Sequence, residues 1–222
     1  AMRDHLRDPA IFDRVRATPW TERDARAIAD AASGIPTPAA ARLLLAHLQR
    51  VSEPRERMIH YLRHVARYAP AAETDPLPGL VQHSVPADLD LQLDLHEVAR
   101  AGFAERGETL PASMRAWSES LVAHYLDRTY GAGLEPGDLS QRRQQAARIA
   151  GDLRLQAAEP NLLALFADTT SEPAARVSAG RALLAIDRVR HLALVGGALS
   201  DAATPASMRE ELVGALAAAG PE

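Results

Sequence analysis

Apolar residues recur along most of this chain at intervals of three and four positions, which is the spacing of one face of a helix. Residues 21–32, 111–128, 139–153 and 188–199 show it clearly. Each of these stretches predicts an amphipathic helix with one buried side. No convincing strand interrupts them, so the pattern predicts an all-α fold.

Further helix starts are marked by a hydroxyl residue followed closely by proline. A Ser or Thr side chain can accept a hydrogen bond from a backbone N–H of the first turn, and proline fits there because that N–H needs no helical partner. We therefore expect helices to begin at the following pairs, the last helix ending near Gly220: Thr37 with Pro38, Ser52 with Pro54, Ser171 with Pro173, and Thr204 with Pro205.

One segment has the period of a strand. Leu89, Leu91, Leu93 and Leu95 alternate with polar residues, which taken alone favours a half-buried strand. We nevertheless predict a helix, because leucine is not β-branched and no hairpin partner is visible. Leu91 and Leu95 also continue at helical spacing towards Phe103, and the other two leucines would widen the buried stripe.

A spacing motif recurs near the end of the chain. Ala175, Ala179, Ala182, Leu183 and Ile186 share one helix face, and the same spacing returns 33 positions later and also in residues 58–69. The two further copies are Met208, Leu212, Ala215, Leu216 and Ala219, and Met58, Leu62, Val65, Ala66 and Ala69. Stacked two-helix units need such a stripe, because each buries its apolar face only against its neighbours. We expect one helical-repeat domain over residues 1–222, with a break near 70–86, where proline and polar residues gather.

These residues resemble a known repeat. Pro173, Arg176, Ala179, the Ala182 and Leu183 pair and Ile186 are similar to the second helix of a HEAT repeat, a unit of armadillo-type α-solenoids. The resemblance implies stacked antiparallel helix pairs wound into a right-handed superhelix. It also implies a non-catalytic scaffold or protein-interaction module. The interval of 33 positions is shorter than the roughly 40 to 47 residues of a HEAT unit.

A second resemblance covers the first half of the chain. Residues 28–48, 61–68 and 91–117, with Arg106 and Gly107, look like the HEAT-bearing central region of large bacterial secreted proteins. Those proteins pair a sugar-dehydrogenase-like propeller with a c-type haem domain. The resemblance implies a fragment of a larger bacterial protein, a spacer or docking segment whose partners are neighbouring domains of the same polypeptide. It implies a periplasmic location, and without it we expect a cytoplasmic one.

Composition narrows the partners and the chemistry. All 25 basic residues are Arg, 29 residues are acidic, and the net charge is −4. Nucleic-acid binding needs concentrated positive charge, so this balance argues against a nucleic acid and favours a protein partner. Cysteine is absent, which excludes disulfides, thiol nucleophiles and covalent haem attachment, and we expect no cofactor. No apolar run reaches the length of a membrane span, and residues 2–16 are too charged for a secretory signal, so we expect a soluble chain.

The best candidate for a binding surface is a basic strip on one predicted helix. Arg57, His60, Arg63, His64 and Arg67 lie at helical spacing on its polar side. In a solenoid the second helix of each pair lines the concave side, where partners bind. The alternative is an ordinary solvated helix whose arginines pair with nearby acids.

Catalytic and metal sites have weaker support in the sequence. His60 and His64 lie one turn apart, a spacing that can hold a metal ion, but Tyr61 stands where a zinc protease has glutamate. The neighbouring arginines also disfavour a cation, so we expect no metal site. The alternative function that stays open is an α-helical enzyme with His60, His64 and acidic residues in a concave groove.

The two tryptophans are assigned structural roles. Trp117 shares a helix face with Met114, Leu121 and Tyr125, and this pattern predicts a core position. Trp20 immediately precedes Thr21 and is predicted to brace a helix start rather than to bind a ligand.

Overall fold

The computed structural model describes residues 9–131 and 134–218. Within these residues the helices are joined by turns and loops, and no strand is present. The predicted all-α class is therefore confirmed. The chain divides into two compact units, Ala1–Trp117 and Ser118–Glu222, and the boundary falls inside one helix, α9 (Ala112–Leu126).

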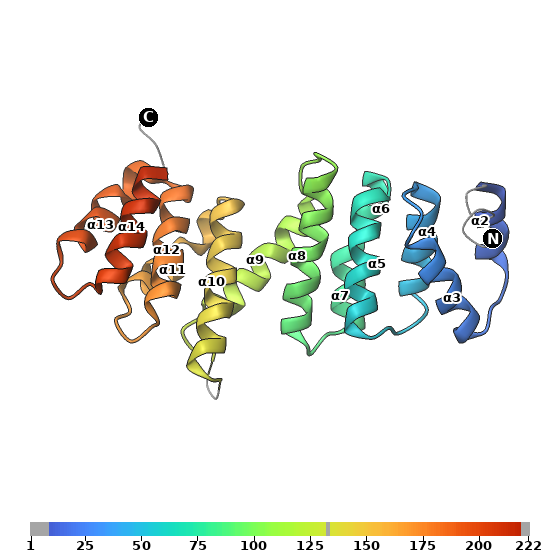
Figure 1. Cartoon of the computed structure of the whole chain (residues 1–222), viewed down its shortest axis with the longest axis horizontal. Coiled ribbons are helices and arrows are strands. Elements are labelled where there is room, and N and C mark those ends of the chain that lie inside the picture. Colours follow the sequence, from blue (N-terminus) through green and yellow to red (C-terminus); the bar gives the residue numbers. More distant parts are fainter. Residues whose placement is uncertain (1–8, 132–133, 219–222) are drawn as a thin grey trace. The chain divides into compact units, whose positions relative to one another are not determined.

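The first unit is a row of helices that follow each other in chain order. Its elements are α2 (Pro9–Ala17), α3 (Glu22–Ala32), α4 (Pro38–Leu48), α5 (Arg55–Tyr68), α6 (Ala71–Thr74), α7 (Leu77–Ser84) and α8 (Leu89–Glu105), with the beginning of α9. Figure 1 shows α4, α5 and α8 side by side, and α4 packs on α5 and α5 on α8. Helices α2 and α3 both pack against α4, and α7 packs against α8.

The second unit is built around one central helix. Its elements are the end of α9, α10 (Pro136–Asp152), the 3-10 turn η1 (Gln156–Ala158), α11 (Glu159–Ala167), α12 (Pro173–Ile186), α13 (Arg188–Ser200) and α14 (Ala206–Ala218). Helix α12 packs against α10, α11, α13 and α14. Its buried face includes Ala175, Ala179 and Gly180, and such small residues let neighbouring helix axes approach closely.

Side-chain caps fix several helix starts. Hydrogen bonds of 2.8 to 3.3 Å run from a first-turn backbone N–H to the side chains of Thr21, Thr37, Asp88 and Asp187. The predicted start at Thr37 is therefore confirmed, with its hydroxyl accepting from the N–H of Ala40.

The predicted caps at Ser52 and Ser171 are wrong. Helix α5 begins directly after Pro54 and α12 directly after Glu172, and neither start has a side-chain cap. Proline fixes its own φ near the helical value and lacks the N–H that a cap would satisfy. It can therefore start a helix by its backbone geometry alone.

The leucine-rich segment at 89–95 forms the first turns of α8, so the prediction of a helix there is confirmed. Leu91, Leu93 and Leu95 are all buried. Helix α8 packs against both α5 and α7, which requires apolar residues on more than one side. Because α5 and α7 cover different sides of α8, buried leucines recur at every second position, which is also the spacing of a half-buried strand.

The recurring stripe is a buried feature of both units. Its copy in α5, residues 58–69, is buried at all five apolar positions, and Met208 and Leu212 are buried in α14. Ala219 and the predicted helix end at Gly220 lie outside the described residues. Residues 70–86 hold the short helices α6 and α7, and a break of the repeat array there stays a prediction.

Gly102 sets the distance between α5 and α8. A Cβ atom on Gly102 would lie 2.8 Å from the Cβ of Ala66 and 3.0 Å from the carbonyl oxygen of Arg63. We expect Gly102→Ala to lower the free energy of unfolding of the first unit by about 1–2 kcal/mol, although alanine is the better helix former, because the α5 backbone would have to move.

Urea unfolding followed by tryptophan fluorescence measures this loss, because Trp20 and Trp117 both belong to the first unit. The matched control is Gly79→Ala in α7, where a new Cβ would meet nothing within 4 Å. We expect this control to stabilise the unit by about 0.5–1 kcal/mol. An equal gain in both variants would contradict the close approach of α5 and α8.

Candidate functional site

The predicted basic strip lies along α5, and its arginines pair with acids of neighbouring elements. Arg57 lies 3.7 Å from a carboxylate oxygen of Asp30 in α3 and 3.5 Å from one of Glu53. Both pairs involve a partly exposed guanidinium, so each contributes little stability alone.

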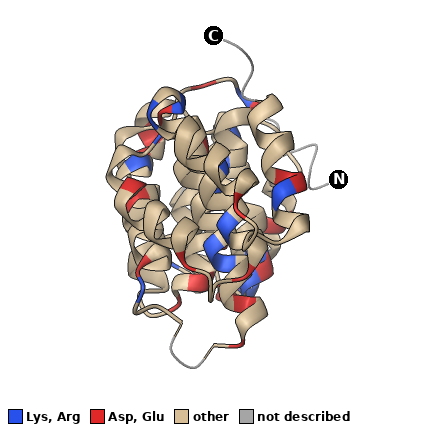
Figure 2. Ribbon diagram, turned by 90° about the vertical axis from the view of Figure 1, so that its left-hand side faces the viewer, with Lys and Arg blue, Asp and Glu red and all other residues tan. Residues whose placement is uncertain are grey.

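The other two arginines of the strip share one acid. Arg63 and Arg67 both pair with Glu105 of α8, the second at 2.8 Å. The hydrogen bond from Arg63 and the charges of both arginines hold the pKa of Glu105 below its ordinary value. Figure 2 shows the same tendency more widely, since acidic and basic residues are interspersed along the helices rather than gathered by sign.

The two histidines of the strip have different surroundings. His60 is exposed, and its Nε2 lies 3.0 Å from the hydroxyl oxygen of Ser33. His64 is only 7% exposed, and burial lowers its pKa to about 4. The prediction that both lie on the solvated side is therefore wrong for His64, because the turn with Ser33 and Ile35 covers that side of α5.

A buried neutral imidazole cannot contact a partner at the surface, so His64 leaves the predicted strip. Arg57, His60, Arg63 and Arg67 remain candidate partner-binding residues. Among residues 9–131 and 134–218, no three His, Asp or Glu side chains are grouped so that they could hold a metal ion.

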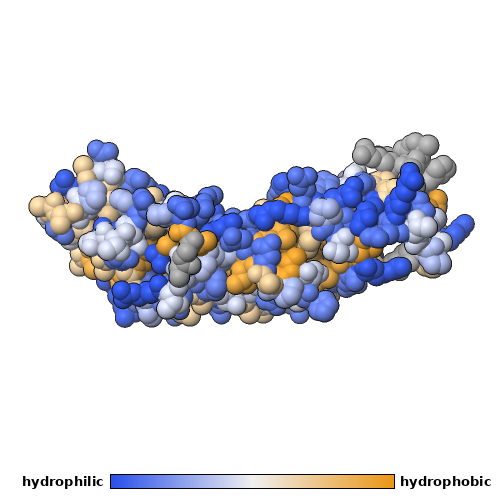
Figure 3. All heavy atoms as spheres, turned by 90° about the horizontal axis from the view of Figure 1, so that it is seen from below, coloured by the Kyte–Doolittle hydropathy of each residue, from blue (hydrophilic) through white to orange (hydrophobic). Residues whose placement is uncertain are grey.

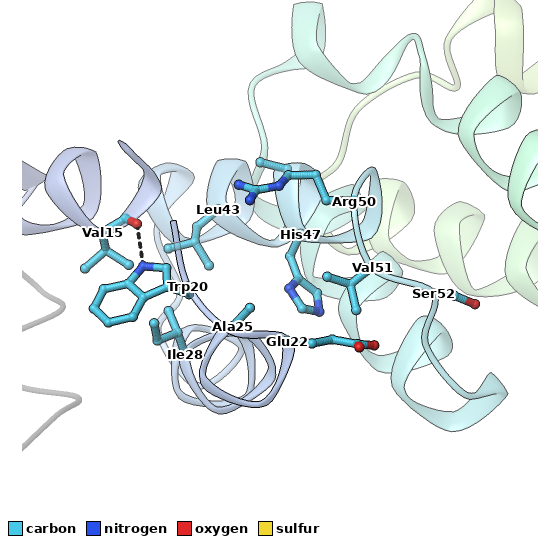
Figure 4. A pocket seen from close by; sticks show the side chains of 11 residues that line it. Val15, Trp20, Glu22, Ala25, Ile28, Leu43, His47, Arg50, Val51 and Ser52 are labelled. Atoms are coloured by element: carbon cyan, nitrogen blue, oxygen red, sulfur yellow. Dashed lines mark hydrogen bonds between the residues drawn. The ribbon is translucent and has the colours of Figure 1, made fainter. Parts of the chain in front are cut away.

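A pocket of about 420 Å³ opens in the first unit between α2, α3 and the end of α4. Figure 4 shows its side chains close up. Apolar walls come from Val15, Trp20, Ala25, Ile28, Leu43, Ala46 and Val51, and polar groups come from Glu22, His47, Arg50 and Ser52. This pocket was not predicted, since its walls come from three helices and the segments that follow them in the chain.

Trp20 forms one wall of the pocket. Its indole N–H donates a 2.8 Å hydrogen bond to the carbonyl oxygen of Val15, as drawn in Figure 4. This bond fixes the ring, which stays 43% exposed. Trp20 directly precedes Thr21, the N-cap of α3, and it presents an aromatic surface to the pocket.

Behind the pocket lies a buried charge cluster around Glu53, whose side chain is inaccessible to solvent. One carboxylate oxygen of Glu53 lies 2.8 Å from Nε2 of His47 and accepts a 3.0 Å hydrogen bond from Nε of Arg26. Its other oxygen lies 3.5 Å from a guanidinium nitrogen of Arg57. The cluster therefore joins α3, the end of α4 and the start of α5.

Tyr61 extends this cluster on the α5 side. Its ring meets His47 edge-on, with centroids 5.8 Å apart, and its hydroxyl donates to Asp30 of α3. Burial, together with the hydrogen bond and charge of Asp30, raises the pKa of Tyr61, so this hydroxyl remains a donor.

In many acid–base catalysts a histidine is the base and a carboxylate orients it. Such catalysis needs a reacting group within reach of the imidazole. In Figure 4 the Ser52 hydroxyl points away from His47. The contacts of the Glu53 cluster hold three helices together.

No family model, curated protein or solved structure matches this chain. The HEAT resemblance consequently stays a prediction. Across the described ranges, no helix combines the length and the apolar character that crossing a bilayer requires.

Proposed function

We propose that this chain is a non-catalytic helical-repeat module of the HEAT type that binds a protein partner through the exposed face of α13 and α14. The observation that carries the proposal is an apolar surface on this last hairpin. Val189 is 70% exposed and Val213 55% exposed, and Leu192 and Leu194 are also exposed. In Figure 3 the surface of this hairpin, at the left, is a mixture of weakly apolar and polar residues.

Two of these exposed residues share one face of α13. Val189 and Leu192 are three positions apart on α13, so they project from one face, beyond the buried His191 and Val195 that contact the rest of the unit. A contiguous apolar surface that is left exposed indicates a contact with another protein.

Nearby charged residues already have partners within the second unit. Arg190 pairs with Glu159 at 2.9 Å, and Arg181 pairs with Glu211 at 3.2 Å. Arg190 follows Val189 on α13, so a paired charge lies beside the apolar residues, as at the polar rim of a protein interface.

The arrangement of helices supports the same proposal. In the first unit α5 packs between α4 and α8, and in the second α12 packs between α10 and α14. Adjacent helices packed in a row are what a stacked-repeat array needs. The alternative of an enzyme centred on His60 and His64 has less support, because His64 is buried.

We expect Val189→Glu to abolish partner binding without unfolding the protein, because the side chain is exposed and a charge would have to be buried in the interface. A photoreactive amino acid at position 192, introduced in cells that make the protein, should cross-link to the partner. Val189→Glu should lower the cross-linked fraction by about tenfold or more.

The matched control is Ala174→Glu, which places the same charge on an exposed apolar position of α12. Cross-linking from position 192 should be unchanged in this variant. If cross-linking from position 192 is no stronger than from position 174, the proposed surface is not used.

A further inference from the structure

The pocket between α2, α3 and α4 has the build of a small ligand site. Its volume of about 420 Å³ lies in the range of about 300–1,000 Å³ that is usual for ligand pockets. Ile28 and Leu43 form a buried apolar floor, and Trp20 adds an exposed aromatic face. A phenyl or branched aliphatic group would therefore find contacts on several sides. The site lies in the first unit, so it is independent of the surface proposed on α13 and α14.

The charges that line the pocket do not cancel. Glu22 is paired with Arg26 at 2.5 Å, so its charge is already matched. The Arg50 side chain is exposed, and no other described residue accepts a hydrogen bond from its guanidinium or pairs with it. The unmatched charge among the lining residues is therefore positive.

The unmatched arginine lies where a ligand could reach it. Figure 4 shows Arg50 beside His47 at the upper rim, with its guanidinium turned to the side on which Leu43 and Trp20 lie. A guanidinium binds a carboxylate through two parallel hydrogen bonds, and this pairing is stronger where neighbouring apolar walls exclude water.

We propose that this pocket binds an apolar group that carries a carboxylate, with the apolar part against Trp20, Ile28 and Leu43 and the carboxylate on Arg50. Two sources share this chemistry: a free aromatic or aliphatic acid, and the C-terminal residue of a peptide. The apolar walls set the affinity for the hydrophobic part, and Arg50 selects the acid over its neutral analogues.

The test uses three probes on the whole chain: N-acetylphenylalanine, its neutral amide, and the tripeptide Gly-Gly-Phe. The readout is the NMR signal of the Trp20 indole N–H, assigned with Trp20→Phe. We expect a saturable shift of this signal, with the acid bound about tenfold more tightly than the amide. The indole signal of the buried Trp117 should not move.

Three variants identify the groups responsible. Arg50→Gln should remove the preference for the acid over the amide. Ala46→Leu should abolish binding of both, because the larger side chain fills the pocket. The control Arg23→Gln removes an exposed arginine of α3 that does not line the pocket, and it should change nothing.

Each outcome decides the proposal. Equal binding of N-acetylphenylalanine and Gly-Gly-Phe supports a site that accepts peptide C-termini, and binding of the first alone supports a site for small acids. The proposal is overturned if no probe shifts the Trp20 signal saturably, if the acid and amide bind equally, or if Arg50→Gln keeps the preference.

Discussion

Replacing Glu53 by alanine is expected to lower the free energy of unfolding of the first unit by about 3 kcal/mol. The Glu53 carboxylate is fully buried and contacts His47, Arg26 and Arg57. Without it, His47 loses its hydrogen-bond partner in the core, and the guanidinium of Arg26 keeps only the exposed Glu22. Leaving partners of a buried charge unmatched costs far more than losing a surface ion pair. Urea unfolding monitored by tryptophan fluorescence measures the effect.

The control for this variant is Glu56→Ala, three positions further along. Glu56 is exposed in the first turn of α5, so its loss removes only a favourable interaction with the helix dipole and should cost less than about 1 kcal/mol. Glu53→Gln tests the negative charge alone, since the amide has the shape of the carboxylate and its oxygen can still accept the hydrogen bond from Arg26. Similar losses for Glu53→Ala and Glu56→Ala would show that the cluster does not hold the helices together.

The helices could be predicted from the sequence because the signals that form them are local. Apolar spacing and the Thr37 cap involve residues within a few positions of one another, and their hydrogen bonds form within the same turns. Even the misleading alternation at Leu91, Leu93 and Leu95 could be assigned correctly, because leucine favours helices and has no branch at Cβ.

The candidate sites could not be predicted in the same way, because the side chains that contact each other there are distant along the chain. The basic strip of α5 was visible, but Arg63 pairs with an acid 42 positions away. Arg26 and Glu53 are separated by 27 positions. Helical spacing indicates which side chains share a face, but it does not indicate what covers that face.

The burial of His64 illustrates the same limit. On α5 alone it belongs with Arg63 and Arg67, but in the folded chain it contacts the turn containing Ser33 and Ile35 and is only 7% exposed. The pocket at Trp20 likewise depends on how α2, α3 and α4 meet. Both features belong to the packing of helices, which the apolar pattern constrains only loosely.

Acidification from pH 7 to pH 5 is expected to destabilise the first unit because two of its histidines are buried in the neutral form. Burial lowers the pKa of His96 to about 3 and that of His64 to about 4, whereas an unfolded histidine titrates near pH 6.5. Below that pH the unfolded chain takes up protons that the folded chain does not. The free energy of unfolding should then fall by up to about 1.4 kcal/mol per pH unit for His96, and His64 acts in the same direction.

Urea midpoints at pH 7, 6 and 5 measure this dependence, and the variant pair His64→Gln with His96→Gln tests its source. Glutamine keeps a polar end but does not titrate, so the double variant should lose less stability between pH 7 and pH 5 than the wild type, whatever its stability at pH 7. The lowered pKa of Glu105 does not contribute to this pH dependence, because its carboxylate takes up a proton only below pH 5. His83→Gln, on the exposed face of α7, should keep the wild-type dependence. A double variant with an unchanged dependence would assign the acid sensitivity to other groups and would show that both imidazoles are protonated in the folded unit.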